Sequence, residues 1–159
     1  MKTASQTEQF GTAFGRNAEP GDVLCLDGDL GAGKTTLSQA IAKGLAVPTD
    51  CYVTSPSFAI LHEYPGRITM YHMDFYRLHD YTEVEDLGFE EYFYLPGLTV
   101  IEWSQRAEEL LPESRLSLYI EICDQDSRRV TCTFQEKHWQ QRLAQILHEA
   151  GLETENIMI

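Results

Sequence analysis

The chain has 159 residues, with 12 lysines and arginines against 25 aspartates and glutamates, and a formal net charge of -13. This length supports one domain, spanning residues 1–159, and a composition of 43% hydrophobic and 23% charged residues excludes a disordered tail. There is no apolar run near the roughly 20 residues that cross a bilayer and no signal-peptide stretch, so we expect a cytoplasmic protein with no membrane association. The acidic balance argues against direct binding along a phosphodiester backbone; any RNA involved is expected to be held by another protein.

The N-terminal part predicts a helix, a strand, a loop and a second helix. Ser5 and Glu8 have capping-box spacing before apolar residues at helical spacing, which predicts a helix ending by residues 19–21. Residues 22–27 have a continuous apolar centre, which is typical of a strand covered on both faces. A glycine-rich loop follows, and then a helix with an apolar stripe that ends before Pro48.

The middle of the chain predicts a hairpin and a helix. Residues 58–64 and 67–73 are β-rich and are joined by a Pro-Gly pair, so part of the sheet should be antiparallel. Thr82 and Glu85 form another capping box, which predicts a helix through Leu87 and toward Tyr92. Its apolar residues are candidates either for core packing or for a partner surface.

The C-terminal part predicts one more strand, a second hairpin and a closing helix. Residues 98–103 form an apolar strand, and 116–122 alternate with period two, as do 130–134. Residues 139–147 are amphipathic, and we expect that helix to end the chain at 156–159. Helices interleaved with strands predict an α/β domain with a mixed parallel/antiparallel sheet.

The four cysteines are expected to be free thiols. They form no CxxC pair and have no histidine at zinc-ligand spacing. Cys25 and Cys132 lie in apolar or alternating runs and are predicted to be small core residues. A disulfide between Cys123 and Cys132, which flank a predicted turn, is disfavoured in a reducing compartment.

The strongest signal is a phosphate-binding loop that fits GxxxxGK[ST] at every fixed position. Glycines allow positive φ and bring backbone N–H groups around phosphate oxygens. The lysine reaches β- and γ-phosphates, and the threonine hydroxyl is a hard ligand for Mg²⁺. The predicted strand before the motif and helix after it favour this interpretation over a chance glycine-rich turn. The motif, with one residue more, consists of Gly28, Asp29, Leu30, Gly31, Ala32, Gly33, Lys34, Thr35 and Thr36.

Two acidic residues at predicted strand ends complete a candidate Mg²⁺-nucleotide site. Glu102 ends the run 98–102 in the manner of a Walker B carboxylate, since ligands gather beyond the carboxyl ends of strands. Asp74 follows another strand and would hold Mg²⁺, position a water or sense the γ-phosphate. The alternative for both is a solvated or capping acid.

Three further features are less specific. The hydroxyl-rich segment 54–58 is either a switch that orders on the γ-phosphate or an ordinary turn. His72 and His79 are more often structural residues than bases. Arg77 is expected to form a salt bridge with Asp74 rather than to reach phosphate.

Taken together, these motifs resemble the bacterial TsaE (YjeE) family of ATPases. The P-loop alone would be unspecific, but its combination with the HxDxYRL-like stretch and the Ile-Glu-Trp strand end is quite specific. The order and spacing match from about Gly21 to Pro112. The matching stretches are residues 28–36, 54–58, 71–78, 83–88 and 101–103.

The resemblance implies an α/β, P-loop NTPase-like three-layer domain with a Mg-ATP site. Lys34 would contact phosphates, and Thr35 and Glu102 would hold Mg²⁺. Asp74 would serve turnover rather than binding, and Trp103 would lie close to the nucleotide. By position, three more residues match family nucleotide contacts: Glu8, Gln105 and Arg128.

The resemblance also implies a poor ATPase that acts with two partner proteins, which are TsaB- and TsaD-like. Together they would form N6-threonylcarbamoyladenosine at position 37 of ANN-decoding tRNAs. The partners would hold the tRNA, which suits the acidic charge of this chain. This subunit would hydrolyse ATP to reset the complex.

Two other function classes remain as alternatives. A small-molecule P-loop kinase fits the size, but kinases usually supply an arginine-rich lid, and this chain has eight widely scattered arginines. A GTP-driven switch ranks last because no Asn-Lys-x-Asp guanine reader is present.

Overall fold

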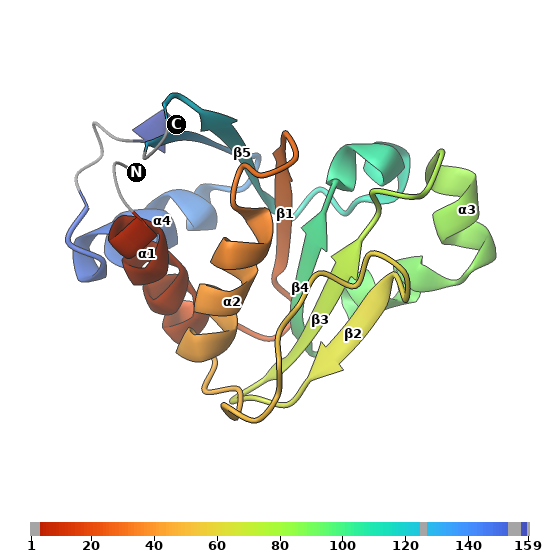
Figure 1. The fold of residues 1–159 in the computed structure, drawn as a ribbon, viewed down its shortest axis with the longest axis horizontal. Coiled ribbons are helices and arrows are strands. Elements are labelled where there is room, and N and C mark those ends of the chain that lie inside the picture. The colour runs from red at the N-terminus through yellow and green to blue at the C-terminus, as the bar shows by residue number, and fades with distance from the viewer. Residues whose placement is uncertain (1–3, 125–126, 153–156, 159) are drawn as a thin grey trace.

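The structure, a computed structural model, describes residues 4–124, 127–152 and 157–158 (Figure 1). Its elements follow the predicted order of helices and strands. In chain order they are α1 (Ala4–Asn17), β1 (Val23–Gly28), α2 (Lys34–Gly44), β2 (Leu61–Tyr64), β3 (Thr69–Asp74), α3 (Tyr81–Asp86), the 3₁₀ helix η1 (Phe89–Tyr94), β4 (Gly97–Glu102), the 3₁₀ helix η2 (Ser104–Leu110), β5 (Leu116–Ile122), β6 (Arg128–Phe134), α4 (Lys137–Glu149) and β7 (Ile157–Met158).

The strands form one sheet in the order β2-β3-β4-β1-β5-β6-β7. The central strands β3, β4, β1 and β5 are parallel, whereas β2 pairs antiparallel with β3 and β6 antiparallel with β5. Both predicted hairpins are therefore confirmed, as is the mixed sheet. The carboxyl ends of β1, β3 and β4 meet at one edge, which is where a P-loop domain places its ligands.

Alternate residues of the strands pack into two separate apolar clusters on opposite faces of the sheet. Leu24 and Leu26 of β1 belong to the larger cluster, which includes side chains from α1, α2 and α4. Val23 and Cys25 belong to the smaller one, which includes side chains from α3, η1 and η2. This alternation follows from the period of two in a strand. The domain therefore has three layers, with α1, α2 and α4 gathered away from α3 (Figure 1).

The helices of the larger cluster pack at close range. A Cβ at Gly15 of α1 would collide with the carbonyl oxygen of Ile41 in α2, so the close approach of α1 to α2 requires a glycine. On the other side of α1, the ring of Phe14 stacks on Trp139 of α4 with centroids 6.2 Å apart. Both rings are fully buried. The glycine contact fixes α2, and therefore the P-loop before it, against α1.

Two predicted helix starts are wrong. Ser5 lies inside α1 and is not its N-cap. The N-cap of α3 is Asp80, whose carboxylate accepts a hydrogen bond from the backbone N–H of Thr82 at 3.0 Å. Aspartate is among the best N-cap residues, so it displaces the predicted threonine.

The helix predicted to reach Tyr92 is instead two short helices, α3 and η1. They are separated at Gly88, which has a φ of 73°. Core packing is confirmed for part of its apolar residues, and a partner surface on the others stays a prediction. Val84 and Phe93 lie in the smaller cluster, whereas Leu87 and Tyr94 are exposed.

The end of the chain also differs from the prediction. Helix α4 ends at Glu149, before Gly151 with its φ of 65°, and residues 157–158 form strand β7 rather than helix. Asn156 and Ile159 lie outside the described residues, as do positions 125–126 of the second hairpin turn. The cysteines are free, as expected. Among the helices that the structure describes, none is both long and apolar enough for a membrane span.

Candidate functional site

The P-loop, residues 28–35, connects the carboxyl end of β1 to the first turn of α2. Gly28 has a φ of 136°, and a Cβ there would collide with the carbonyl oxygen of Ile120. Gly33, with a φ of 107°, is the N-cap of α2. Glycine takes both conformations without strain. The loop therefore leads into a helix N-terminus, where the partial positive charge of the helix favours an anion.

Lys34 is buried, and its side chain folds back along the loop. Its ammonium donates to the carbonyl oxygens of Gly28 at 2.7 Å and Asp29 at 2.9 Å, and lies 4.1 Å from the centroid of the Trp103 ring. Burial lowers the pKa of Lys34, and the carboxylate of Glu102 opposes that shift. The ammonium of Lys34 thus lies at the P-loop with main-chain oxygens as partners, and its contact with phosphates stays a prediction.

Glu102 is the last residue of β4 and is almost completely buried. Its Oε2 accepts a hydrogen bond from the Thr35 hydroxyl at 3.1 Å. Its Oε1 lies 2.9 Å from His72 Nε2 and 3.3 Å from the Ser38 hydroxyl, which also lies 3.1 Å from the carbonyl oxygen of Lys34. The predicted pairing of the P-loop threonine with a strand-end carboxylate is therefore present.

The donor set around Glu102 fits Mg²⁺. Carboxylate and hydroxyl oxygens are hard ligands, and Mg²⁺ in nucleotide sites is bound by one or two of them together with substrate phosphates. Among the residues that the structure describes, no cluster of three or more His, Cys, Asp or Glu side chains could hold a metal alone. A metal beside Thr35 and Glu102 would therefore share its coordination with a bound phosphate.

Asp74 ends β3 and is the register partner of Glu102 in β4. Its Oδ1 accepts a hydrogen bond from the backbone N–H of Tyr76 at 2.9 Å, and its Oδ2 accepts one from the Ser55 hydroxyl. Ser55 belongs to the segment 54–58, so this segment contacts the site through Asp74. Both strand-end carboxylates are therefore within one small region.

Arg77 does not form the predicted salt bridge. Its guanidinium lies 4.1 Å from the centroid of the Phe58 ring, and no ion pair among the described residues joins it to Asp74. This leaves the sequence-predicted ion pair unformed.

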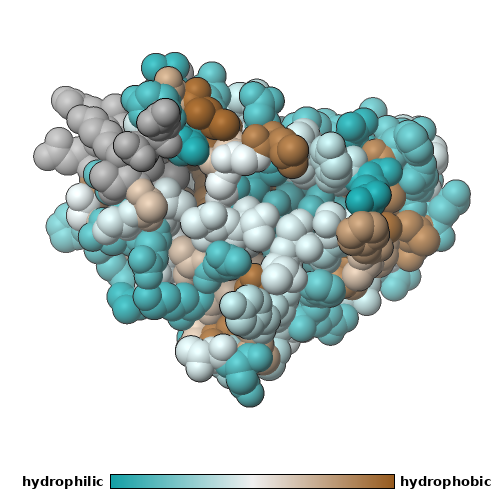
Figure 2. Space-filling view, in the orientation of Figure 1, coloured by the Kyte–Doolittle hydropathy of each residue, from teal (hydrophilic) through white to brown (hydrophobic). Residues whose placement is uncertain are grey.

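Two large hydrophobic side chains near the site are exposed to solvent. Phe58 is 84% exposed, and Leu30 of the P-loop is 75% exposed. Hydrophobic side chains on the face in Figure 2 gather in separate patches on a largely polar surface.

A cavity of about 390 Å³ joins these groups. It contains both strand-end carboxylates, the P-loop lysine and threonine, and two hydroxyls of the segment 54–58. Tyr76 also lines it, and its ring centroid is 5.0 Å from that of Trp103. The lining residues are Leu30, Gly31, Gly33, Lys34, Thr35, Thr36, Ser55, Ser57, Asp74, Tyr76, Arg77, Glu102 and Trp103.

Glu8, Gln105 and Arg128, which were matched to family nucleotide contacts by position alone, lie in different places. Arg128 Nε donates to the carbonyl oxygen of Ala32 at 3.1 Å, so this side chain contacts the P-loop. The Glu8 carboxylate forms an exposed ion pair of 2.6 Å with Lys43. Gln105 lines a different cavity, beside α3 and η2. None of the three is among the residues that line the P-loop cavity, and their contact with nucleotide stays a prediction.

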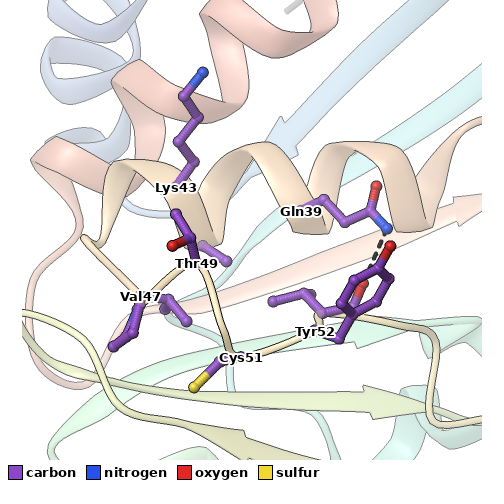
Figure 3. Close-up of a pocket in the computed structure, with 9 residues that line it drawn as sticks. Gln39, Lys43, Val47, Thr49, Cys51 and Tyr52 are labelled. Atoms are coloured by element: carbon purple, nitrogen blue, oxygen red, sulfur yellow. Dashed lines mark hydrogen bonds between the residues drawn. The ribbon is translucent and has the colours of Figure 1, made fainter.

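A larger cavity, of about 480 Å³, lies between α2 and the segment that follows it (Figure 3). Gln39 spans part of it and donates to the carbonyl oxygen of Val53 at 2.9 Å. Its lining includes Cys51 and Tyr52 but no P-loop residue and no carboxylate. The smaller cavity is therefore the candidate site.

Sequence reasoning missed two contributors to this site. Tyr76 lines the cavity, and Ser38 contacts Glu102. Ser38 lies one helical turn beyond Lys34 on the covered face of α2, and this spacing could have identified it. Tyr76 belongs to the HxDxYRL-like stretch, within residues 71–78, and this stretch could have identified it.

Comparison with known proteins gives one consistent result. Residues 1–130 match the family model described as threonylcarbamoyl adenosine biosynthesis protein TsaE. The chain is 48% identical over 117 residues to the tRNA threonylcarbamoyladenosine biosynthesis protein TsaE of Bacillus subtilis, which covers 73% of this chain and 72% of the relative. It is 38% identical over 130 residues to the protein of the same name from Treponema pallidum, covering 82% and 95%.

The fold is similar to a solved structure. The crystal structure of Bacillus subtilis YdiB superposes with a TM-score of 0.79 and 34% sequence identity, covering 93% of this chain and 91% of that one. The similarity therefore extends over nearly the whole of both chains.

Proposed function

The chain belongs to the TsaE family, and from this premise we propose that it is an ATP-hydrolysing accessory subunit in the formation of N6-threonylcarbamoyladenosine on ANN-decoding tRNAs. One observation supports the hydrolytic part most directly. A single cavity is lined by the lysine and threonine of a P-loop and by two strand-end carboxylates, Asp74 and Glu102. These are the parts that P-loop enzymes use to bind and cleave a triphosphate.

ATP would bind with its phosphates at the P-loop and with Mg²⁺ beside Thr35 and Glu102. The metal would supply charge neutralisation on the β- and γ-phosphate oxygens. The loop N–H groups and the N-terminus of α2 add positive potential at the same point. Trp103 and Arg128, which border the loop, are proposed to contact the nucleotide.

Lys34 changes partner when ATP binds. Its ammonium, which donates to the carbonyl oxygens of Gly28 and Asp29, would donate instead to phosphate oxygens. A cation aimed at the transferred group stabilises the charge that develops in the transition state. Lys34 therefore serves both affinity and turnover.

Asp74 would orient the attacking water. Its two oxygens accept hydrogen bonds from Ser55 and from the backbone of Tyr76, which fix the carboxylate in the lining of the cavity. A carboxylate held in this way can accept a hydrogen bond from a water placed for in-line attack. Ser55 ties this group to the segment 54–58, so ordering of that segment would control when water is positioned.

We further propose that the isolated chain is a weak ATPase and that TsaB- and TsaD-like proteins stimulate it. Before nucleotide binds, its key polar groups are paired with one another, and hydrolysis benefits from exclusion of bulk water by a partner. The net charge of -13 suits a subunit that does not itself bind tRNA along the backbone. The partners would hold the tRNA in the cytoplasm.

Phosphate release tests this function. The chain alone, the chain with purified TsaB- and TsaD-like proteins, and the chain with partners and tRNA are compared at saturating Mg-ATP. We expect release to rise at least about tenfold with partners, which corresponds to about 1.4 kcal/mol of barrier. Lys34→Ala is the matched control and should remove the stimulated release. ADP formation that depends on a small-molecule acceptor and ignores the partners would contradict the proposal and indicate a kinase.

A further inference from the structure

We infer that His72 is a positioning residue for Glu102, holding this carboxylate so that one oxygen remains directed at Thr35 and the metal. The inference rests on the proposed function, because it concerns the carboxylate proposed to hold Mg²⁺. It assigns a purpose to a buried imidazole that the proposed hydrolysis does not otherwise use.

His72 and Glu102 lie on adjacent parallel strands and on the same face of the sheet. His72 pairs in register with Val100 of β4, two residues before Glu102, so both side chains project toward α2. His72 is 0% exposed and Glu102 is 2% exposed. Their contact, 2.9 Å between Nε2 and Oε1, is therefore closed to water.

The surroundings of the imidazole determine its tautomer. Nε2 faces an oxygen that accepts hydrogen bonds, whereas Nδ1 is buried with no partner among the described residues. A buried N–H without an acceptor costs about 1–3 kcal/mol. A hydrogen therefore belongs on Nε2, and His72 donates it to Glu102.

The hydrogen bond from His72 gives the two carboxylate oxygens of Glu102 different roles. Oε1 is held by His72, while Oε2 faces the Thr35 hydroxyl. The Ser38 hydroxyl lies 3.3 Å from Oε1 and shares its hydrogen with the carbonyl oxygen of Lys34 at 3.1 Å. Rotation of the carboxylate would break both contacts to Oε1. Residues that orient a metal ligand from behind typically account for roughly 10- to 100-fold in metal affinity.

The experiment is calorimetric titration of ADP into the full chain at a series of Mg²⁺ concentrations and in EDTA. His72→Met removes the donor at similar volume, whereas His72→Gln places an amide N–H near the position of Nε2. We expect the Mg²⁺ midpoint to rise about 10- to 100-fold in His72→Met and to be restored in His72→Gln. ADP affinity in EDTA should stay within about twofold in both.

Two controls make the outcome decisive. His62→Met, at the register partner of His72 in β2, removes a histidine from the same sheet without touching Glu102, and it should leave the midpoint unchanged. Glu102→Gln should raise the midpoint. If Glu102→Gln raises it and His72→Met does not, the inference is overturned and the proposed metal site stands. If Glu102→Gln leaves it unchanged, the metal site itself is wrong and the inference fails with it.

Protein stability is measured in parallel, because a purely structural role would lower Tm without moving the Mg²⁺ midpoint of the folded protein. If His72→Met does not fold, His72→Asn replaces it, since its shorter amide cannot reach Glu102. A midpoint equal in His72→Asn and His72→Gln would also overturn the inference.

Discussion

The interior beneath α1 and α4 and the edge at the carboxyl ends of β1, β3 and β4 are buried to a similar degree but are built differently. In the interior, Phe14 and Trp139 are fully buried and pack ring against ring. At the edge, Lys34, Asp74 and Glu102 are 5%, 4% and 2% exposed and contact other polar groups. Apolar burial stabilises a fold, whereas buried charge costs stability unless it is paired. The edge therefore depends on the interior for its position. Substitutions can lower the stability of the interior or the activity of the edge separately.

The largest expected effect is on the interior. Trp139→Ala removes a ring that stacks on Phe14 and lies 4.4 Å from the guanidinium of Arg142. Truncation of a buried tryptophan costs about 3–5 kcal/mol in free energy of unfolding, measured by urea denaturation. Trp139→Phe is the control and should lose about half as much or less. If nucleotide affinity of the folded fraction also falls, the two regions are not separable.

Lys34→Ala tests the edge alone. We expect Mg-ATP turnover to fall about 100- to 1000-fold, as for loss of a single charge-stabilising donor, and affinity to fall with it. Because burial lowers the pKa of Lys34, a charged ammonium there costs stability at pH 7, so Tm should not drop. Phosphate release, calorimetry and thermal unfolding measure the three quantities. A large fall in Tm would show that the edge also stabilises the fold.

Asp74→Asn separates the effect of the sheet edge on nucleotide binding from its effect on turnover. The amide keeps the size of the side chain but orients water poorly, so we expect phosphate release to fall about 100-fold. ADP affinity should change less than about threefold, because Lys34 and the P-loop remain. Titration calorimetry that finds no ATP binding to this variant would refute the division.

The smallest expected effect is a difference in reactivity among the cysteines, which compares buried and exposed parts of the chain without any substitution. Burial raises the pKa of Cys25 to about 12 and that of Cys132 to about 12. At pH 8 roughly one such thiol in ten thousand is a thiolate, and thiolate is the reactive form. Exposed Cys123 should therefore react with a thiol reagent first, with Cys25 and Cys132 unmodified until the protein unfolds. Mass spectrometry of the labelled protein identifies the sites.

The parts of the site that were predictable are those in which residue type and position carry the chemistry together. The P-loop has a fixed spacing, and Glu102 ends an apolar strand, so both could be placed at one sheet edge before any coordinates. Asp74 followed from the same reasoning, and its register pairing with Glu102 supports it. The hairpins were predictable because apolar and polar residues alternate with a period of two along their strands.

Other features depend on tertiary contacts that local pattern does not encode. Arg77 contacts Phe58 rather than Asp74 because segment 54–58 returns to the site. Thr82 had the predicted capping spacing, but Asp80 accepts the hydrogen bond first. This competition is local, because Asp80 lies two residues before Thr82 and aspartate is among the best N-cap residues.

The indole beneath Lys34 gives this chain its own optical reporter. Of two tryptophans, Trp139 is buried in the interior, whereas the ring centroid of Trp103 lies 4.1 Å from the Lys34 ammonium. In the proposed function this ammonium would leave the ring to reach phosphate. Withdrawal of that cation alters the field on the excited ring. Stopped-flow emission should thus follow nucleotide arrival in real time, with no dye attached.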